Sequence, residues 1–359
     1  MDDALSATRP LPYTQEELRF TGRGSEYFRI WIVNLLLTIV TLGIYSAWAK
    51  VRRLQYFYRH TELAGSGFDF HGDPVRILIG RIVALVMVGV YNYTVRLQSV
   101  WTLVVLVAAA IILPWLVRNS LRFRLYNTSW RGTRFHFRGS LGGAYRVFLL
   151  NGLLTIVTLY GLAPFAHQRL KAYQHGNSWF GQTQFSFHAG VGKFYRAYLL
   201  ALAGAVAFIA IAVVAGIGSS MGAVLLAQKP GGHVDPQAIF KTVFVIWGAA
   251  LVVGLSIGPI FHAVLTNLIW NNTRLGEHRI ECHMRPLRLM WIVASNFVLV
   301  VVTLGFFMPW AKVRLVRFQV ESIKVLPAGD LQEFVAAEPE TLGAVGEEAA
   351  SIFDIEISL

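Results

Sequence analysis

The sequence predicts a mainly α-helical, polytopic membrane protein built from repeated units of an apolar helical hairpin followed by a short β-strand and turn. Its 359 residues are 55% hydrophobic and only 14% charged, whereas soluble proteins carry about 25% charged residues. Four apolar stretches approach the ~20 residues that cross a bilayer as a helix. These are Ile77–Tyr93, Val100–Val117, Tyr198–Ala227 and Val243–Leu265.

Three further apolar segments align with one another without gaps. Each contains an asparagine that is followed seven residues later by a threonine, fourteen later by an aromatic residue and eighteen later by an arginine. Such regular spacing predicts an internal repeat. The aligned positions are Asn34, Asn151 and Asn296; Thr41, Thr158 and Thr303; Trp48, Phe165 and Trp310; Arg52, Arg169 and Arg314.

A second pattern follows the helices. A glycine turn precedes alternating aromatic residues, as in 64–72 and 180–190, and this alternation predicts short strands. We therefore expect a membrane domain at 20–324, between a polar N-terminus (1–19) and an acidic C-terminal tail (325–359). Its four units and truncated fifth span about 20–74, 75–139, 140–190, 191–284 and 285–324.

Two membrane topologies fit these units. If every apolar run is one span, there are seven, and the basic segments after Arg169 and Arg274 break the positive-inside rule. Alternatively, units two and four each hold two spans, and the other three are re-entrant hairpins that leave every basic segment and the C-terminus cytoplasmic. We favour this second topology, although a run of ~22 residues also reaches ~33 Å as one helix. Glycines next to β-branched threonines would break the re-entrant helices, at Gly43, Gly161 and Gly305.

Six polar residues recur inside apolar helices and are candidates for function. A carboxamide in lipid must find a hydrogen-bond partner, so interhelical bonding is the plainer interpretation. The alternative is a transport pathway, because interrupted helices in corresponding repeats mark transport sites. The residues are Asn34, Asn151, Asn296, Thr41, Thr158 and Thr303.

Aromatic and basic residues gather where the apolar runs end. This pattern predicts interfacial anchors and determinants of topology, and the positive charge also suits anionic lipid headgroups. It accounts for the net charge of +12 without nucleic-acid binding. The set comprises Trp48, Lys50, Arg52, Trp115, Arg118, Arg169, Trp310, Lys312 and Arg314.

The sequence offers little enzyme chemistry. It has neither a His-Glu-x-x-His motif nor a phosphate-binding loop, so we expect no enzyme and no cofactor. His71, His188 and His283 are weak metal candidates, because no carboxylate or cysteine recurs beside them. The single cysteine, Cys282, excludes an intrachain disulfide.

The residues Phe20–Gly72, and the phrase Thr-Leu-Gly followed by Trp-Ala-Lys-x-Arg at Thr41–Arg52 and Thr303–Arg314, resemble the YjgN family of bacterial inner-membrane proteins. This is a domain-of-unknown-function family. The resemblance extends over nearly the whole chain. The middle copy departs, with Phe165 and His167 in place of tryptophan and lysine. The resemblance implies an inner-membrane location and brings no established substrate or catalytic residue.

Three functional hypotheses follow. The first is a channel- or transporter-like conduit lined by the recurring asparagines and threonines. The second is a non-transporting membrane scaffold that binds anionic lipid or a partner protein through its basic cytoplasmic face. A membrane enzyme ranks last. The sequence leaves a homo-oligomer open.

Overall fold

The computed structural model describes residues 15–97, 100–227 and 236–328. Most of the predicted acidic tail and the first fourteen residues lie outside these ranges. The chain forms two compact units. The first comprises the described parts of Met1–Ala189, Ile269–His283 and Pro309–Leu359, and the second comprises those of Gly190–Leu268 and Met284–Met308.

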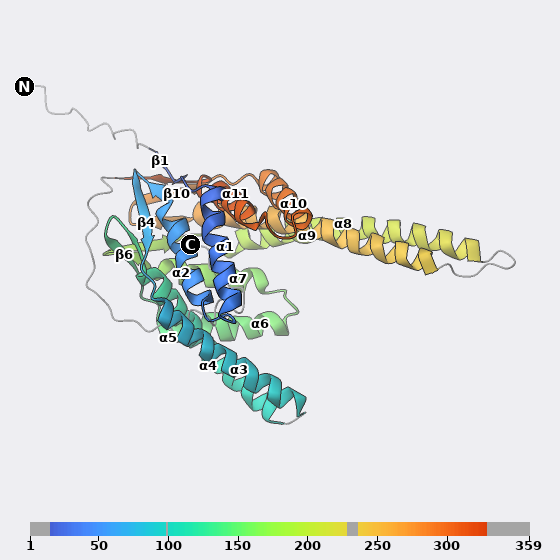
Figure 1. The fold of residues 1–359 in the computed structure, drawn as a ribbon, viewed down its shortest axis with the longest axis horizontal. Coiled ribbons are helices and arrows are strands. Elements are labelled where there is room, and N and C mark those ends of the chain that lie inside the picture. The colour runs from blue at the N-terminus through green and yellow to red at the C-terminus, as the bar shows by residue number, and fades with distance from the viewer. Residues whose placement is uncertain (1–14, 98–99, 228–235, 329–359) are drawn as a thin grey trace, which may run out of the picture. The chain divides into compact units, whose positions relative to one another are not determined.

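Helices make up most of the described chain, as the sequence predicts (Figure 1). They are α1 (Gly24–Val40), α2 (Ser46–Arg59), α3 (Pro74–Arg96), α4 (Trp101–Tyr126), α5 (Leu141–Ala144), η1 (Tyr145–Leu150), α6 (Asn151–Val157), α7 (Ala163–Gly176), α8 (Val191–Ala227), α9 (Pro236–Trp270), α10 (Pro286–Val302) and α11 (Met308–Val320).

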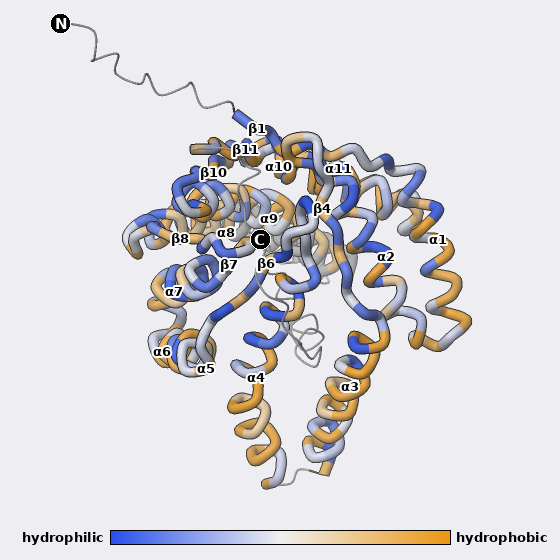
Figure 2. Tube along the Cα trace, turned by 90° about the vertical axis from the view of Figure 1, so that its left-hand side faces the viewer, coloured by the Kyte–Doolittle hydropathy of each residue, from blue (hydrophilic) through white to orange (hydrophobic). Residues whose placement is uncertain are grey.

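Four of these helices contain a segment long and apolar enough to cross a membrane. The segments are Pro74–Arg96, Trp101–Tyr126, Val191–Ala210 and Leu251–Trp270, and each overlaps one of the four long apolar stretches of the sequence. Figure 2 shows apolar residues along α3 and α4, most densely away from the sheet. At the sheet end of α3, Pro74 occupies the first turn and the Asp73 side chain accepts a hydrogen bond from the Val75 N–H at 2.9 Å, a favourable helix start.

Short strands occupy the predicted alternating segments, and all of them join in one antiparallel sheet within the first unit. Their order is β1-β11-β10-β9-β8-β7-β6-β5-β4-β3-β2. They are β1 (Glu16–Glu17), β2 (Arg19–Phe20), β3 (Thr61–Leu63), β4 (Ser66–Phe70), β5 (Thr128–Trp130), β6 (Thr133–Phe137), β7 (Ser178–Phe180), β8 (Thr183–Phe187), β9 (Thr273–Leu275), β10 (His278–Cys282) and β11 (Ile323–Leu326).

The sheet closes on itself through the N-terminal segment. Its two end strands, β1 and β2, are separated in the chain by Leu18 alone. Glu17 pairs with Lys324 of β11, and Arg19 pairs with Glu62 of β3. Over the described residues, the first and last strands, β1 and β11, therefore pair with each other and complete the sheet.

Apolar side chains fill the inside of the sheet, because every second residue of a strand points to the same face. Leu63, Trp130 and Phe180 are buried there at 9%, 3% and 2% exposure. Phe68, Phe135 and Phe185 stack in sequence across β4, β6 and β8, with 6.4 Å between successive ring centroids. Additional apolar residues pack against this cluster, namely Leu18, Ala64, Leu275 and Val325.

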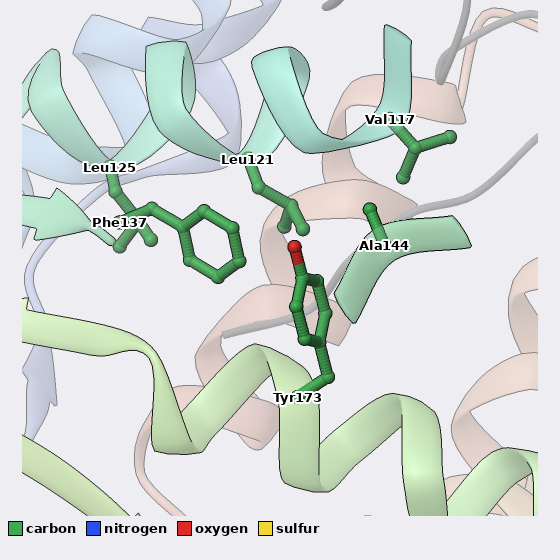
Figure 3. Packing of buried hydrophobic residues seen from close by; sticks show 6 residues of the cluster. All are labelled: Val117, Leu121, Leu125, Phe137, Ala144 and Tyr173. Atoms are coloured by element: carbon green, nitrogen blue, oxygen red, sulfur yellow. The ribbon is translucent and has the colours of Figure 1, made fainter. Parts of the chain in front are cut away.

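A second apolar core joins the sheet to the helices. Figure 3 shows Val117, Leu121 and Leu125 of α4 facing Phe137 of β6 and Tyr173 of α7. The Tyr173 hydroxyl donates a hydrogen bond to the Ser140 carbonyl at 2.9 Å. This packing fixes the ends of α4 and α7 beside the strands that follow them.

Candidate functional site

Three tight turns interrupt the repeated apolar segments where the sequence predicts helix breaks. Between α1 and α2 the turn covers residues 41–45, between α6 and α7 it covers 158–162, and between α10 and α11 it covers 303–307. Helices α1 and α2 contact each other, as do α6 and α7. Each of these two segments is thus a helical hairpin, and we name the three turns the hairpin tips.

Every backbone N–H of a hairpin tip has a partner within the tip or the preceding helix. In each of Thr41–Ser46, Thr158–Ala163 and Thr303–Met308, six consecutive N–H groups donate hydrogen bonds of 2.8–3.2 Å. The pattern is the same in all three and includes the 6→1 bond typical of a Schellman turn. No N–H in these segments needs water, which is one of the conditions for placing a turn in an apolar medium.

The side chains at the hairpin tips are apolar and exposed. Leu42, Leu159 and Leu304 are 94%, 89% and 90% exposed. The helix residues just before them are also open, with Val40 at 78% and Val302 at 73%. Contiguous exposed apolar surface of this kind marks contact with a membrane or a partner.

The three repeated threonines are structural caps of these tips. The Thr41 hydroxyl donates to the Leu37 carbonyl at 2.7 Å and accepts from the Tyr45 N–H at 2.9 Å. Thr158 and Thr303 make the same pair of bonds. Each hydroxyl thus satisfies the end of one helix and the start of the next, and the expected lining of a pathway gains no support from these contacts.

The middle tip corrects one expected helix-breaking glycine. Gly43 and Gly305 both have φ of +93°. At the aligned position the middle copy has Tyr160, with φ of +65°, while Gly161 is not among the residues with positive φ. The break at 158–162 therefore depends on Tyr160 in a left-handed conformation that favours glycine.

Replacing Tyr160 with glycine is expected to stabilise the protein by about 1 kcal/mol, because a left-handed conformation costs an L-residue roughly 1–2 kcal/mol. Equilibrium unfolding of the two proteins measures the difference. The reverse change, Gly43→Ala, should destabilise by a similar amount, since no atom lies within 4 Å of the added Cβ and only the backbone conformation matters. An unchanged stability in both variants would contradict this explanation.

The three repeated asparagines are buried. Asn34, Asn151 and Asn296 are 7%, 6% and 8% exposed. The Asn34 carbonyl oxygen Oδ1 has no hydrogen-bond partner among the described residues. Asn34 and Asn151 belong to the first unit and Asn296 to the second.

The predicted interfacial residues pack around the helix ends in several ways. The Trp310 ring stacks on Phe28 with 4.9 Å between centroids, and Trp48 packs against the core formed by α2, α3, α4 and β4. Trp115 is 39% exposed. The Arg118 guanidinium donates to the Gly139 carbonyl at 2.7 Å.

Two other arginines lie over aromatic rings of their own helical hairpins. The Arg52 guanidinium is 5.7 Å from the Tyr45 ring centre, and that of Arg169 is 5.2 Å from Phe165. Both side chains are exposed, whereas Lys50, Lys312 and Arg314 are half-buried.

The three candidate metal histidines follow strands of the sheet and bond to its backbone. The N–H groups of His71, His188 and His283 donate to carbonyl oxygens of Asn127, Asn272 and Ser322 at 2.8–2.9 Å. The His71 ring also contacts the Ser129 hydroxyl at 2.8 Å. Over residues 15–97, 100–227 and 236–328, no three histidine, cysteine or acidic side chains are close enough to hold a metal ion.

Comparison with known proteins identifies relatives over almost the full length. The inner membrane protein YjgN of Salmonella typhimurium is 24% identical over 373 aligned positions, which cover 90% of this chain and 91% of the relative. Proteins of the same name from Escherichia coli O157:H7 and Escherichia coli strain K12 are 35% and 33% identical over 144 positions. That alignment covers 38% of this chain and 35% of each relative.

No solved structure matches the chain. A family model described as "Bacterial protein of unknown function (DUF898)" matches residues 15–352. The match begins where the closed sheet begins and includes all four apolar helices. The chain therefore belongs to the DUF898 family of bacterial membrane proteins of unknown function.

Proposed function

We propose that the chain is a bacterial inner-membrane protein in which four segments cross the bilayer and three helical hairpins enter and leave on one face. The joining of the eleven strands of the described residues in a single sheet carries this proposal. Strands that hydrogen-bond to one another cannot lie on opposite sides of a bilayer. The chain must therefore cross an even number of times between successive parts of the sheet, which seven single spans do not allow.

The lengths of the helices agree with this topology. Helices α3 and α4 have 23 and 26 residues, long enough for a core of ~30 Å at 1.5 Å per residue. From Tyr45, the residue that precedes α2, to Arg52 the rise is about 10 Å. The exposed Leu42 at the tip of this hairpin would then lie near the middle of the bilayer while Arg52 stays at the headgroups.

The distribution of positive charge supports a cytoplasmic sheet. The repeated basic helix ends all precede strands of the sheet, and cytoplasmic segments carry the excess of lysine and arginine. We define the basic belt as four exposed arginines of the first unit: Arg52 and Arg169 in α2 and α7, and Arg138 and Arg146 between β6 and α6.

A non-transporting scaffold that binds anionic lipid headgroups is the function that this arrangement supports best. The interior of the closed sheet is packed with aromatic and aliphatic side chains, so it offers no polar path. The threonines expected to line a pathway are engaged in caps. The basic belt instead presents guanidinium groups at the depth of lipid phosphates, where each arginine contributes about 1 kcal/mol of attraction.

Lipid selectivity tests this function. In mixed bilayers, spin-labelled phosphatidylglycerol should associate with the protein severalfold more strongly than spin-labelled phosphatidylcholine. The triple change Arg52→Gln, Arg138→Gln and Arg169→Gln should remove most of that preference. The matched control changes Arg131, Arg274 and Arg279, which are exposed at the turns and outer face of the sheet, and should retain it.

The conduit is the second candidate, because the Oδ1 atom of Asn34 is buried without a partner among the described residues. Solute flux through vesicles that contain the wild-type protein would support it, provided that Asn34→Leu with Asn151→Leu abolishes the flux and leaves the protein folded. Flux of this kind, together with equal lipid selectivity in both triple variants, would contradict the scaffold.

A further inference from the structure

One buried stripe of α7 is polar. Four side chains occupy one stripe of this helix and are each at least nine-tenths buried: Gln168, Lys171, Gln174 and His175 are 9%, 8%, 2% and 1% exposed. Burial of a polar side chain without partners costs several kcal/mol, and burial of a charge costs more. A stripe of this composition therefore needs polar partners.

The corresponding stripe of α2 is apolar or aromatic. Counted from Asn34 and Asn151, the residues that correspond to Gln168, Lys171, Gln174 and His175 are Val51, Leu54, Phe57 and Tyr58. The same helical position can thus be filled by an ordinary hydrophobic core. The polar stripe is specific to the middle hairpin and is not a requirement of the fold.

Three acceptor atoms of the stripe have no partner among the described residues. They are Oε1 of Gln168, Oε1 of Gln174 and Nε2 of His175. The Gln168 amide N–H group already donates to the Ala189 carbonyl at 3.0 Å, which fixes the orientation of that carboxamide.

The hydrogen bonds of Thr273 identify the tautomer of His175. The Thr273 hydroxyl donates to the Ile269 carbonyl at 2.8 Å, so at 3.3 Å it accepts from Nδ1–H of His175. Burial and the nearby charge of Lys171 lower the pKa of His175 to about 3, and the ring is neutral. Its Nε2 is therefore an acceptor that requires a donor.

The polar stripe also carries positive charge. Burial, and then the charge of Arg124 on α4, lower the pKa of Lys171 to about 8, which leaves most of its amine protonated at neutral pH. Within the described part of the chain, no carboxylate or hydrogen-bond acceptor is recorded for this ammonium. Burial of this ammonium beside a second cation is unfavourable, and an anion in contact with it would offset that cost.

We infer that the polar stripe of α7 is a binding site for a phosphate group whose molecule also carries hydroxyl groups. Lys171 and Arg124 would bind the phosphate oxygens, and the ligand hydroxyls would donate to the two glutamine oxygens and to Nε2 of His175. The stripe from Gln168 to His175 rises by about 10 Å along the helix. The headgroup of phosphatidylglycerol has this chemistry, and inorganic phosphate supplies the phosphate oxygens with one or two P–OH groups. The inference does not depend on the scaffold function, because the basic belt is a separate, exposed set of residues.

Two binding measurements on the full chain distinguish the sources. Titration of the protein in phosphatidylcholine nanodiscs with inorganic phosphate tests the free anion. Native mass spectrometry after delipidation of protein from phosphatidylglycerol membranes tests the lipid. Lys171→Met should weaken whichever ligand binds by about tenfold or more, because charge-assisted hydrogen bonds are the strong ones. Lys193→Met removes the same charge from an exposed position of α8 and should change the affinity less than twofold.

The fold of the variants can be checked separately. Without ligand, Lys171→Met should raise the midpoint of thermal unfolding, because it removes a buried charge. Gln168→Val introduces the residue that α2 has at this position and should weaken binding severalfold. Phosphate binding alone would assign the site to the free anion, and retained phosphatidylglycerol alone would assign it to the lipid. Binding of neither ligand, or equal binding by wild type and Lys171→Met, would overturn the inference.

Discussion

Replacing Leu42 with aspartate is expected to destabilise the membrane-inserted protein by about 3 kcal/mol, the cost of a carboxylate at the centre of a bilayer. The Leu42 side chain is 94% exposed and does not belong to the hydrophobic core. In water such a substitution changes stability by less than about 0.5 kcal/mol. The size of the effect therefore reports directly on whether the hairpin tip is surrounded by lipid.

Unfolding in bilayers and in a mild detergent measures this effect. The same change at Leu159 should cost a similar amount, because the two tips have the same hydrogen bonds. Leu97→Asp is the control, since Leu97 is 59% exposed at the end of α3, which the proposed topology places at the opposite headgroups. Equal, small effects at Leu42 and Leu97 would mean that the tip lies in water.

Trp130→Ala is expected to lower the free energy of unfolding by 3–5 kcal/mol, the usual cost of truncating a buried aromatic residue. Trp130 is 3% exposed inside the closed sheet, and its ring centre lies 5.8 Å from that of Phe180 and 6.2 Å from that of Phe68. The cavity would open at the centre of the cluster that joins β3, β5 and β7.

Trp179→Ala serves as the matched control, because this tryptophan of β7 directly precedes the inward-facing Phe180 and so lies on the other face of the sheet. Its ring is covered by the Arg138 guanidinium at 4.7 Å, a contact worth about 0.5–1 kcal/mol at an exposed site. Thermal unfolding of both variants provides the comparison. A loss for Trp130→Ala no larger than that for Trp179→Ala would contradict a packed interior.

Local patterns in the sequence predict much of the fold. The hydropathy of the sequence indicates the four apolar stretches, glycines near threonines indicate the helix breaks, and alternating aromatic residues indicate the strands. Closure of the sheet was not predictable in this way, because pairing of Glu17 with Lys324 joins residues at opposite ends of the chain. The polar residues around Leu18 are typical of an N-terminal segment outside the fold. Only the free edge that β11 would otherwise have could have indicated the pairing of β11 with β1.

The residues of the candidate sites were likewise only partly predictable from the sequence. The repeat alignment identified the three threonines and the helix-breaking role of glycine. It placed the break of the middle hairpin at Gly161, because glycine is the residue that most often ends a helix. The backbone uses Tyr160 instead. The polar stripe of α7 was visible in principle, since Lys171 replaces Leu54 in the aligned copy. Its burial, which gives the substitution its meaning, depends on packing against α4 and β9.

Chemical labelling of single cysteines is the most direct test of the common face of the sheet. In a Cys282→Ala background, Arg131→Cys and Gln182→Cys place thiols in exposed turns of the second and third strand pairs, and Leu97→Cys marks the opposite side. With a membrane-impermeant reagent, we expect only Leu97→Cys to react in intact cells, and the other two to react after permeabilisation. Reaction of Gln182→Cys, but not Arg131→Cys, in intact cells would put the strands on opposite sides of the membrane and contradict both the single sheet and the re-entrant hairpins.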